Sequence, residues 1–193
     1  MVQGSIINRY VIAGCVGVGL FLGTGCGRSP DIIVPPSAES IAVESSVLVA
    51  NAPIPVKYTC DGANSSPPLA WRNIPDSAES LVLWMDDLDA PSGTFTHWVV
   101  YDMPATRQDL PGAISADEVL PQGGTQGKNS FRELGYGGPC PPKGTHRYRF
   151  KLYALSQPTN LPPNASISEV AQQMEGKIVG FGELMAPYTR QSP

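Results

Sequence analysis

Apolar and polar residues alternate most clearly in HRYRFKLYAL, residues 146–155. Successive side chains of a β-strand point to opposite faces of the sheet. His146, Tyr148, Phe150 and Leu152 therefore share one face, and the basic residues between them take the other. Since the apolar face is the one that packs on a core, His146 begins a core-facing row and Tyr148 follows it on the same face.

Two further segments show this pattern with a polar residue at one end. In SLVLWMDD, residues 80–87, an apolar row ends at Asp87. In HWVVYDM, residues 97–103, a row begins at His97. Strict alternation assigns to this second row His97, Val99, Tyr101 and Met103. Both histidines of the chain thus lie at the beginning of an apolar row.

The segment LDAPSGTFT between these two strands predicts a turn, because Ala-Pro-Ser-Gly has Pro and Gly where a tight turn favours them. A hairpin here brings Asp87 and His97 to the same end of a sheet. His146 joins them if its strand runs in the same direction as the strand that starts at His97. We therefore expect a small polar pocket at one end of an apolar sheet. The alternative is structural: strand-end histidines that only form hydrogen bonds, and an aspartate that only caps the turn.

The rest of the chain predicts a mainly β fold. Glycine and proline number 20 each, which favours many short strands joined by turns. Strands are expected at residues 40–49 and 52–60, with an extended loop over 66–75 that enters another strand. A single helix is expected near 166–175, where apolar residues recur on one face and Gly176 follows as a stop signal.

Composition narrows the class of protein. A length of 193 residues fits one domain, and 41% hydrophobic with 16% charged residues is typical of a globular chain. The net charge is −4, and no basic cluster with interleaved aromatic residues stands out. Nucleic acid is therefore not an expected partner.

The N-terminus has the pattern of a lipoprotein export signal. Arg9 precedes an uncharged run that ends before Cys26, too short and too rich in glycine for a spanning helix. We assign residues 1–25 to the signal, 26–40 to a linker and 41–193 to the domain, with Cys26 as the lipidated residue. Cys15 matches the cleavage pattern better by letter but leaves too short an apolar run before it. An ordinary secretory signal or an uncleaved anchor would also place the domain outside the cytoplasm, and a cleaved lipoprotein would sit on the membrane through its lipid.

If the domain is exported, the other two cysteines are in an environment that favours disulfides. Cys60 and Cys140 remain as an even pair in an oxidising compartment, where a disulfide between them is expected. Two free thiols are the alternative. No CxxC spacing supports a zinc or thioredoxin-like site.

Three segments, YTCDGANSSPPLAW, DLDAPSGTFTHWVVYDMPA and GYGGPCPPKGTHRYRFKLYAL, resemble the phosphatidylethanolamine-binding protein family, particularly its bacterial Raf-kinase-inhibitor-like members. The resemblance covers about residues 41–185. It implies an antiparallel β-sandwich with a large central sheet, a few short peripheral helices and a pocket for phosphate-like groups. The pocket residues that it implies are Asp87, His97, His146 and Tyr148, with Ala90, Pro91, Gly138 and Pro141 as its lining. Leu88 stands where the family usually has a proline, which leaves the detailed shape of the turn open.

The function expected from this pattern is non-enzymatic binding of a phosphoryl or phospholipid-headgroup-like ligand, without a cofactor. Inhibition of a protease or another protein partner is the main alternative. A metal-dependent enzyme is a weaker one: two histidines and a carboxylate can bind iron, but no HExxH or close ligand pair occurs, so no metal ligand is assigned. No GxSxG elbow indicates a hydrolase, and QGGTQGKN lacks the first Gly and the final Ser or Thr of a nucleotide-binding loop.

Overall fold

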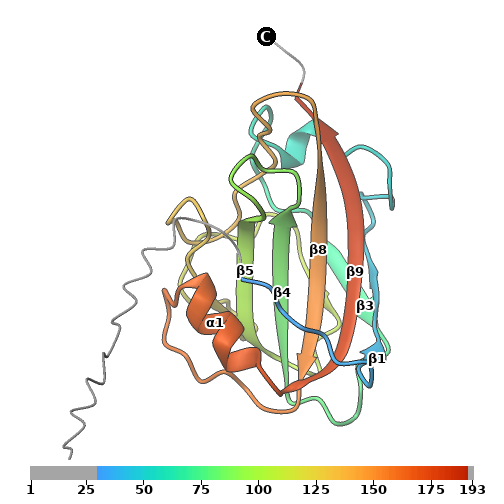
Figure 1. Ribbon diagram of the computed structural model, residues 1–193, viewed down its shortest axis with the longest axis vertical. Helices are drawn as coiled ribbons and strands as arrows, with labels where there is room; N and C mark the ends of the chain where they lie inside the picture. Colours follow the sequence, from blue (N-terminus) through green and yellow to red (C-terminus); the bar gives the residue numbers. More distant parts are fainter. Residues whose placement is uncertain (1–29, 191–193) are drawn as a thin grey trace, which may run out of the picture.

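Figure 1 shows the fold in a computed structural model that describes residues 30–190. A large central sheet is covered by a smaller sheet on one face and by a helix on the other. The expected signal peptide, residues 1–25, lies outside the described residues. The same holds for the expected lipidation residue, Cys26, and for the alternative candidate, Cys15. Among residues 30–190, no helix has the length and apolar character needed to cross a membrane.

The central sheet has six strands in the order β1-β9-β8-β4-β5-β7. Their bounds are β1 Glu39–Ser40, β4 Ser80–Asp87, β5 Phe95–Pro104, β7 Thr125–Gln126, β8 Thr145–Leu155 and β9 Ile178–Thr189. Because β4 is antiparallel to both β5 and β8, these two neighbours run in the same direction. The last residues of β4 and the first residues of β5 and β8 therefore meet at one end of the sheet, at the top of Figure 1.

The smaller sheet consists of β2 Ala42–Glu44, β3 Leu69–Arg72 and β6 Asp109–Leu110, in the order β2-β3-β6. The prediction of a mainly β sandwich with a large, largely antiparallel central sheet is confirmed. The strand expected over 40–49 is shorter than predicted. It ends at Glu44 because the Ser45 hydroxyl accepts hydrogen bonds from the backbone N–H groups of Val47 and Leu48, which turns the chain.

The helix predicted near residues 166–175 is confirmed. α1, Ile167–Met174, begins with a capping box in which Ser166 and Glu169 exchange hydrogen bonds. The strand predicted over 52–60 is wrong: the segment holds a single 3-10 turn, η1, at Val56–Tyr58. Pro53 and Pro55 lack the N–H groups that a strand needs for pairing, which explains the difference.

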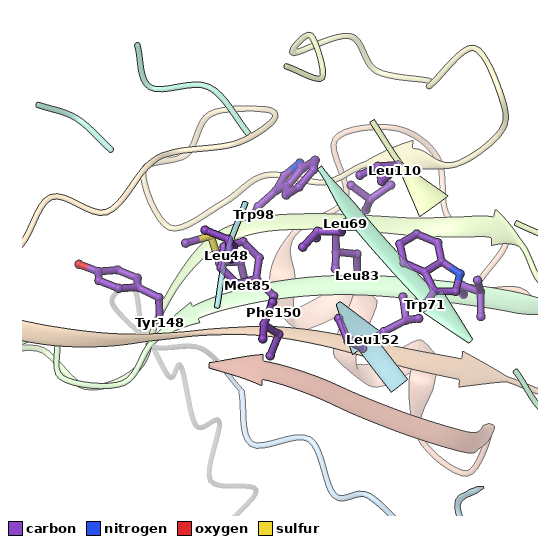
Figure 2. Packing of buried hydrophobic residues seen from close by; sticks show 14 of the residues in the cluster. Leu48, Leu69, Trp71, Leu83, Met85, Trp98, Leu110, Tyr148, Phe150 and Leu152 are labelled. Atoms are coloured by element: carbon purple, nitrogen blue, oxygen red, sulfur yellow. The ribbon is translucent and has the colours of Figure 1, made fainter. Parts of the chain in front are cut away.

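Two apolar clusters pack on opposite faces of the central sheet. The first lies between the two sheets and includes Trp71, Trp98 and Phe150. Figure 2 shows Tyr148 at one end of this cluster, with its hydroxyl pointing away from the labelled leucines. The second cluster lies under α1 and includes Val170 and Met174. The sheet is therefore buried on both faces.

On the second face of the sheet, even side chains that alternation placed opposite the apolar row of β8 are buried. Lys151 of β8 keeps only 6% of its surface exposed. Part of the cover comes from the segment that precedes β1, in which Ile32, Val34 and Ala38 pack against the second cluster. Residues 30–40, within the expected linker, thus lie against the domain, and β1 pairs in parallel with β9.

Candidate functional site

The candidate site forms where β4, β5 and β8 meet. Asp87, the last residue of β4, lies directly opposite Phe95 of β5 and Tyr148 of β8. The β4–β5 connection is a tight turn, in which the Gly93 N–H donates to the Ala90 carbonyl at 2.9 Å. We call Asp87, His97, His146 and Tyr148 the histidine site.

The central contact of the histidine site joins two strands. His146 Nδ1 lies 2.7 Å from Asp87 Oδ2, and both side chains are over nine-tenths buried. The other carboxylate oxygen, Oδ1, accepts the backbone N–H of Asp89 at 2.9 Å. Because an ionised carboxylate only accepts hydrogen bonds, the Nδ1 atom of His146 carries the proton. Its Nε2 atom has no hydrogen-bond partner within residues 30–190.

His97 reaches the site by a route that strict alternation does not predict. The prediction that His97 shares a face with Val99, Tyr101 and Met103 is wrong. Val99 and Tyr101 belong to the second cluster, whereas Met103 belongs to the first. The β4–β5 pairing shifts register between Met85 and Asp86, which makes His97 the extra residue of a β-bulge. The bulge places the His97 ring against Tyr148, with centroids 5.3 Å apart.

The environment of His97 keeps its ring neutral. Nδ1 lies 2.6 Å from the Gly137 carbonyl oxygen, which can only accept, so Nδ1 carries the proton. Burial lowers the pKa of His97 below its usual value of 6.5, although the Gly137 carbonyl and the charges of Asp87 and Asp86 oppose this shift. Near neutral pH the ring therefore presents an unprotonated Nε2 atom, a hydrogen-bond acceptor.

Tyr148 carries an unusual hydroxyl. The residue is fully buried, and the hydroxyl oxygen makes no hydrogen bond of normal geometry within residues 30–190. Burial, followed by the nearby charge of Asp87, raises the pKa of Tyr148, so the group stays protonated. Leaving a buried donor without a partner costs about 1–3 kcal/mol. The histidine site therefore contains one donor, close to Asp87, without a hydrogen bond of normal geometry inside residues 30–190.

The loop before β8 supplies the wall beside His97. Gly138 donates its N–H to Asn64 Oδ1 at 2.7 Å, and a Cβ at this position would lie 2.6 Å from the same oxygen. Gly138 and Pro141 are both buried. A disulfide joins Cys140 in this loop to Cys60, 80 residues away, and the Cys60 N–H donates to the Pro139 carbonyl at 3.1 Å.

The outer side of the site is a shallow surface hollow lined by Asp89, Lys143, Gly144, Thr145, His146 and Arg147. Of the residues implied by the resemblance, only His146 lines it. Ala90 is half-buried and Pro91 is exposed on the adjoining turn. Arg147 donates from Nε and Nη2 to the Asp89 carboxylate at 2.8 and 2.7 Å, and these hydrogen bonds lower the pKa of Asp89 to about 2.

Sequence reasoning missed two aromatic neighbours of the histidine site. The Phe131 ring lies 5.3 Å from that of His97 and 4.7 Å from that of Phe95, centroid to centroid. Phe95 lies 5.2 Å from His97. Position 95 could have been found by its place in the strand, two residues before His97. Phe131 comes from a loop whose approach to β5 has no local signal in the sequence.

Metal binding receives no support from the geometry of the described chain. Within residues 30–190, no three His, Cys, Asp or Glu side chains are grouped so that they could hold a metal ion. In the histidine site, Asp87 Oδ2 and His146 Nδ1 are bound to each other. What the site offers is a set of hydrogen-bonding groups: a hydroxyl donor and two imidazole Nε2 atoms.

The sandwich carries these polar groups at one end of its central sheet. The family model for phosphatidylethanolamine-binding protein matches residues 44–189. The chain belongs to the phosphatidylethanolamine-binding protein family.

Relatives and solved structures agree with this membership. A UPF0098 protein of Methanothermobacter thermautotrophicus is 47% identical over 137 residues, which cover 71% of this chain and 91% of that protein. LppC of Mycobacterium tuberculosis, which its name describes as a candidate lipoprotein, is 40% identical over 79% of this chain and 74% of its own length. The crystal structure of Escherichia coli YbcL, described as a member of the mammalian PEBP family, has a TM-score of 0.73 and 31% identity. It covers 78% of this chain and 99% of its own.

Proposed function

We propose that this protein is a non-enzymatic binding protein and that the histidine site holds a phosphoryl group. The observation that carries the proposal is the Tyr148 hydroxyl, which is buried near Asp87 and makes no hydrogen bond of normal geometry in the described chain. A phosphoryl oxygen would supply the missing acceptor. Hydrogen bonds to charged oxygens are about twice as strong as neutral ones, which would compensate for closing a ligand into a buried site.

The two histidines complement the same ligand. Because Nδ1 of His146 and Nδ1 of His97 donate to Asp87 and Gly137, respectively, both rings keep Nε2 for the ligand. His146 presents Nε2 to a phosphoryl oxygen, with the Asp87 carboxylate holding the ring in this orientation. The unprotonated Nε2 of neutral His97 accepts a hydrogen bond from a singly protonated phosphate. A phosphate monoester near neutral pH offers both kinds of oxygen, since its second pKa is about 6.

The absence of turnover is the second part of the proposal. Nucleophilic catalysis needs a hydroxyl or thiol within hydrogen-bond reach of a base. In residues 30–190, neither histidine ring is hydrogen-bonded to a serine, threonine or cysteine side chain. The Asp87–His146 pair therefore serves to orient an imidazole toward a bound anion.

Titration calorimetry with sodium phosphate at pH 6 and pH 8 tests this proposal. Binding should be tighter at pH 6, where more of the phosphate is singly protonated and can donate to neutral His97. His146→Ala and Tyr148→Phe should each weaken binding by about 1.5–3 kcal/mol, the range for a hydrogen bond to a charged group. Arg72→Gln is the matched control. It removes one exposed positive charge on the smaller sheet, away from the histidine site, and should leave the affinity unchanged. Equal affinities in all four proteins would show that phosphate does not bind at the histidine site.

We also propose that the domain is exported and anchored by lipid at Cys26. The uncharged run before Cys26 and the resemblance to LppC support this location. Cells grown with a tagged fatty acid should label the full chain but not its Cys26→Ser variant, while Cys15→Ser keeps the label. If Cys15→Ser alone loses the label, the anchor lies at Cys15. If the unmodified full chain takes up no label either, the proposal of a lipid anchor is wrong.

A further inference from the structure

Phe131 differs from the other exposed hydrophobic residues of the described chain. Its exposed fraction is 44%, and it is the aromatic member of a set whose other members are Ile33, Val49, Val56 and Val119. Single exposed apolar residues are ordinary on protein surfaces. Phe131 is unusual because its ring is both exposed and packed edge-on against a ring of the histidine site.

The backbone around Phe131 is fixed by a buried side chain. Asn129, which is 5% exposed, accepts the backbone N–H groups of Phe131 and Glu133 on Oδ1 at 2.9 and 3.1 Å. The next residue, Arg132, has a φ of 67°, in the left-handed region that a residue with a Cβ rarely adopts. Strain of this kind persists where the surrounding structure imposes it. The exposed ring is therefore held in place by its turn.

The same ring contacts the wall of the histidine site. A Cβ at Gly137 would lie 2.7 Å from Phe131 Cε2, so glycine is required there for the ring to approach. Gly137 is also the residue whose carbonyl orients His97. Phe131 and Phe95 thus form an apolar edge directly beside the polar groups that are proposed to bind phosphate.

This arrangement points to the chemistry of the ligand beyond its phosphate. Resting on the proposed function, we infer that the ligand is a phosphate monoester whose ester group is apolar, and that Phe131 packs against that group and sets this preference. A polar ester group would lose water at the ring without gaining a hydrogen bond there. The apolar group is either the ring of an aryl phosphate or the chain of a lipid-like alkyl phosphate, and the two are separable by experiment.

Calorimetry with four probes tests the inference: inorganic phosphate, phenyl phosphate, butyl phosphate and phosphoethanolamine. Phenyl phosphate should bind the wild-type protein roughly 2- to 12-fold more tightly than inorganic phosphate, the range expected for an aromatic pair. Phe131→Ala should remove this advantage and leave the affinity for inorganic phosphate unchanged. Phe131→Leu should keep any advantage of butyl phosphate but not that of phenyl phosphate. Val49→Ala, which shortens an exposed apolar residue without ring contacts, should change nothing.

The outcomes separate the inference from the function on which it rests. If inorganic phosphate binds and neither apolar ester binds more tightly, the inference is wrong and the phosphate site stands. The inference also fails if phosphoethanolamine binds most tightly, or if Phe131→Ala weakens all four probes equally. If none of the probes binds, the proposed function is wrong. An advantage for phenyl phosphate alone indicates an aryl ligand, and an advantage for butyl phosphate alone indicates an alkyl one.

Discussion

Asp86 and Asp87 are neighbours at the end of β4, but they belong to opposite faces of the central sheet and to two different polar clusters. Asp87 lies in the histidine site. Asp86 faces Thr96, Arg149 and Lys151. We call these four residues, together with Trp84, the lysine cluster. Both aspartates are at least 96% buried, with exposed fractions of 1% and 4%. The difference between them therefore lies in their partners.

The carboxylate of Asp86 is engaged by the protein itself. It pairs with Lys151, and Oδ1 accepts hydrogen bonds from Trp84 Nε1 at 2.6 Å and Thr96 Oγ1 at 3.3 Å. Arg149 lies further away, with Nη2 3.7 Å from Oδ2, and its buried Nε has no hydrogen bond in the described chain. Arg149 is more open to solvent than the rest, since 29% of its side chain is exposed.

The histidine site has the opposite character. Its carboxylate fixes an imidazole, but the outward nitrogen of that ring and the Tyr148 hydroxyl are not used within residues 30–190. Buried polar groups that are satisfied by the protein stabilise one conformation, whereas groups left unsatisfied in a buried site are available to a ligand. The comparison therefore supports the proposal that the Asp86 face serves stability and the Asp87 face serves binding.

The largest effect expected from this contrast is on stability. Asp86→Asn leaves Lys151 buried without its counter-charge and should lower the free energy of unfolding by about 3–5 kcal/mol. Asp87→Asn keeps an acceptor for His146, so it should lower it by only about 1 kcal/mol, the difference between a charged and a neutral hydrogen bond. Guanidinium denaturation of both variants measures this, with the midpoint shifting at constant slope.

A double variant provides the control for that measurement. Asp86→Leu with Lys151→Met replaces the buried pair by apolar side chains, and such replacements are often neutral or stabilising. It should therefore recover most of the stability lost in Asp86→Asn. If Asp87→Asn proves as damaging as Asp86→Asn, the division of roles between the two faces is wrong.

Period-two alternation predicts one half of the histidine site correctly. β8 is regular through its first residues, so His146 and Tyr148 share the face of the first apolar cluster, and Asp87 meets them across β4. The sandwich and α1 also followed from local signals, namely short apolar runs, turn residues, and the one-face apolar spacing before Gly176.

The other half depends on contacts that local patterns do not encode. One extra residue at the bulge moves His97 away from the row that alternation gives it. Alternation assigns Lys151 to the second face, but its burial depends on α1 and residues 30–38 covering that face. Phe131 reaches His97 through a loop far along the chain, and nothing in its neighbourhood predicts that contact.

The smallest expected effect is a difference between the two faces in how the free energy of unfolding depends on pH. Burial lowers the pKa of His97 in the folded protein from 6.5, whereas burial lowers that of Lys151 from 10.5. Above pH 6.5 His97 is neutral in both the folded and the unfolded chain and contributes no pH dependence. Below pH 6.5 the unfolded chain takes up a proton that the folded one resists, so stability falls as the pH decreases. One such group contributes at most about 1.4 kcal/mol per pH unit.

His97→Gln isolates this contribution, since glutamine can still donate to the Gly137 carbonyl but does not titrate. Unfolding free energies at about pH 7.5 and 5.5, on either side of the ordinary histidine pKa, should show a larger loss for the wild-type protein than for His97→Gln. The groups common to both proteins, including the whole lysine cluster, cancel in this difference. An equal loss in both proteins would mean that His97 accepts a proton in its folded environment as readily as in water, and the neutral imidazole assigned to the histidine site would be wrong.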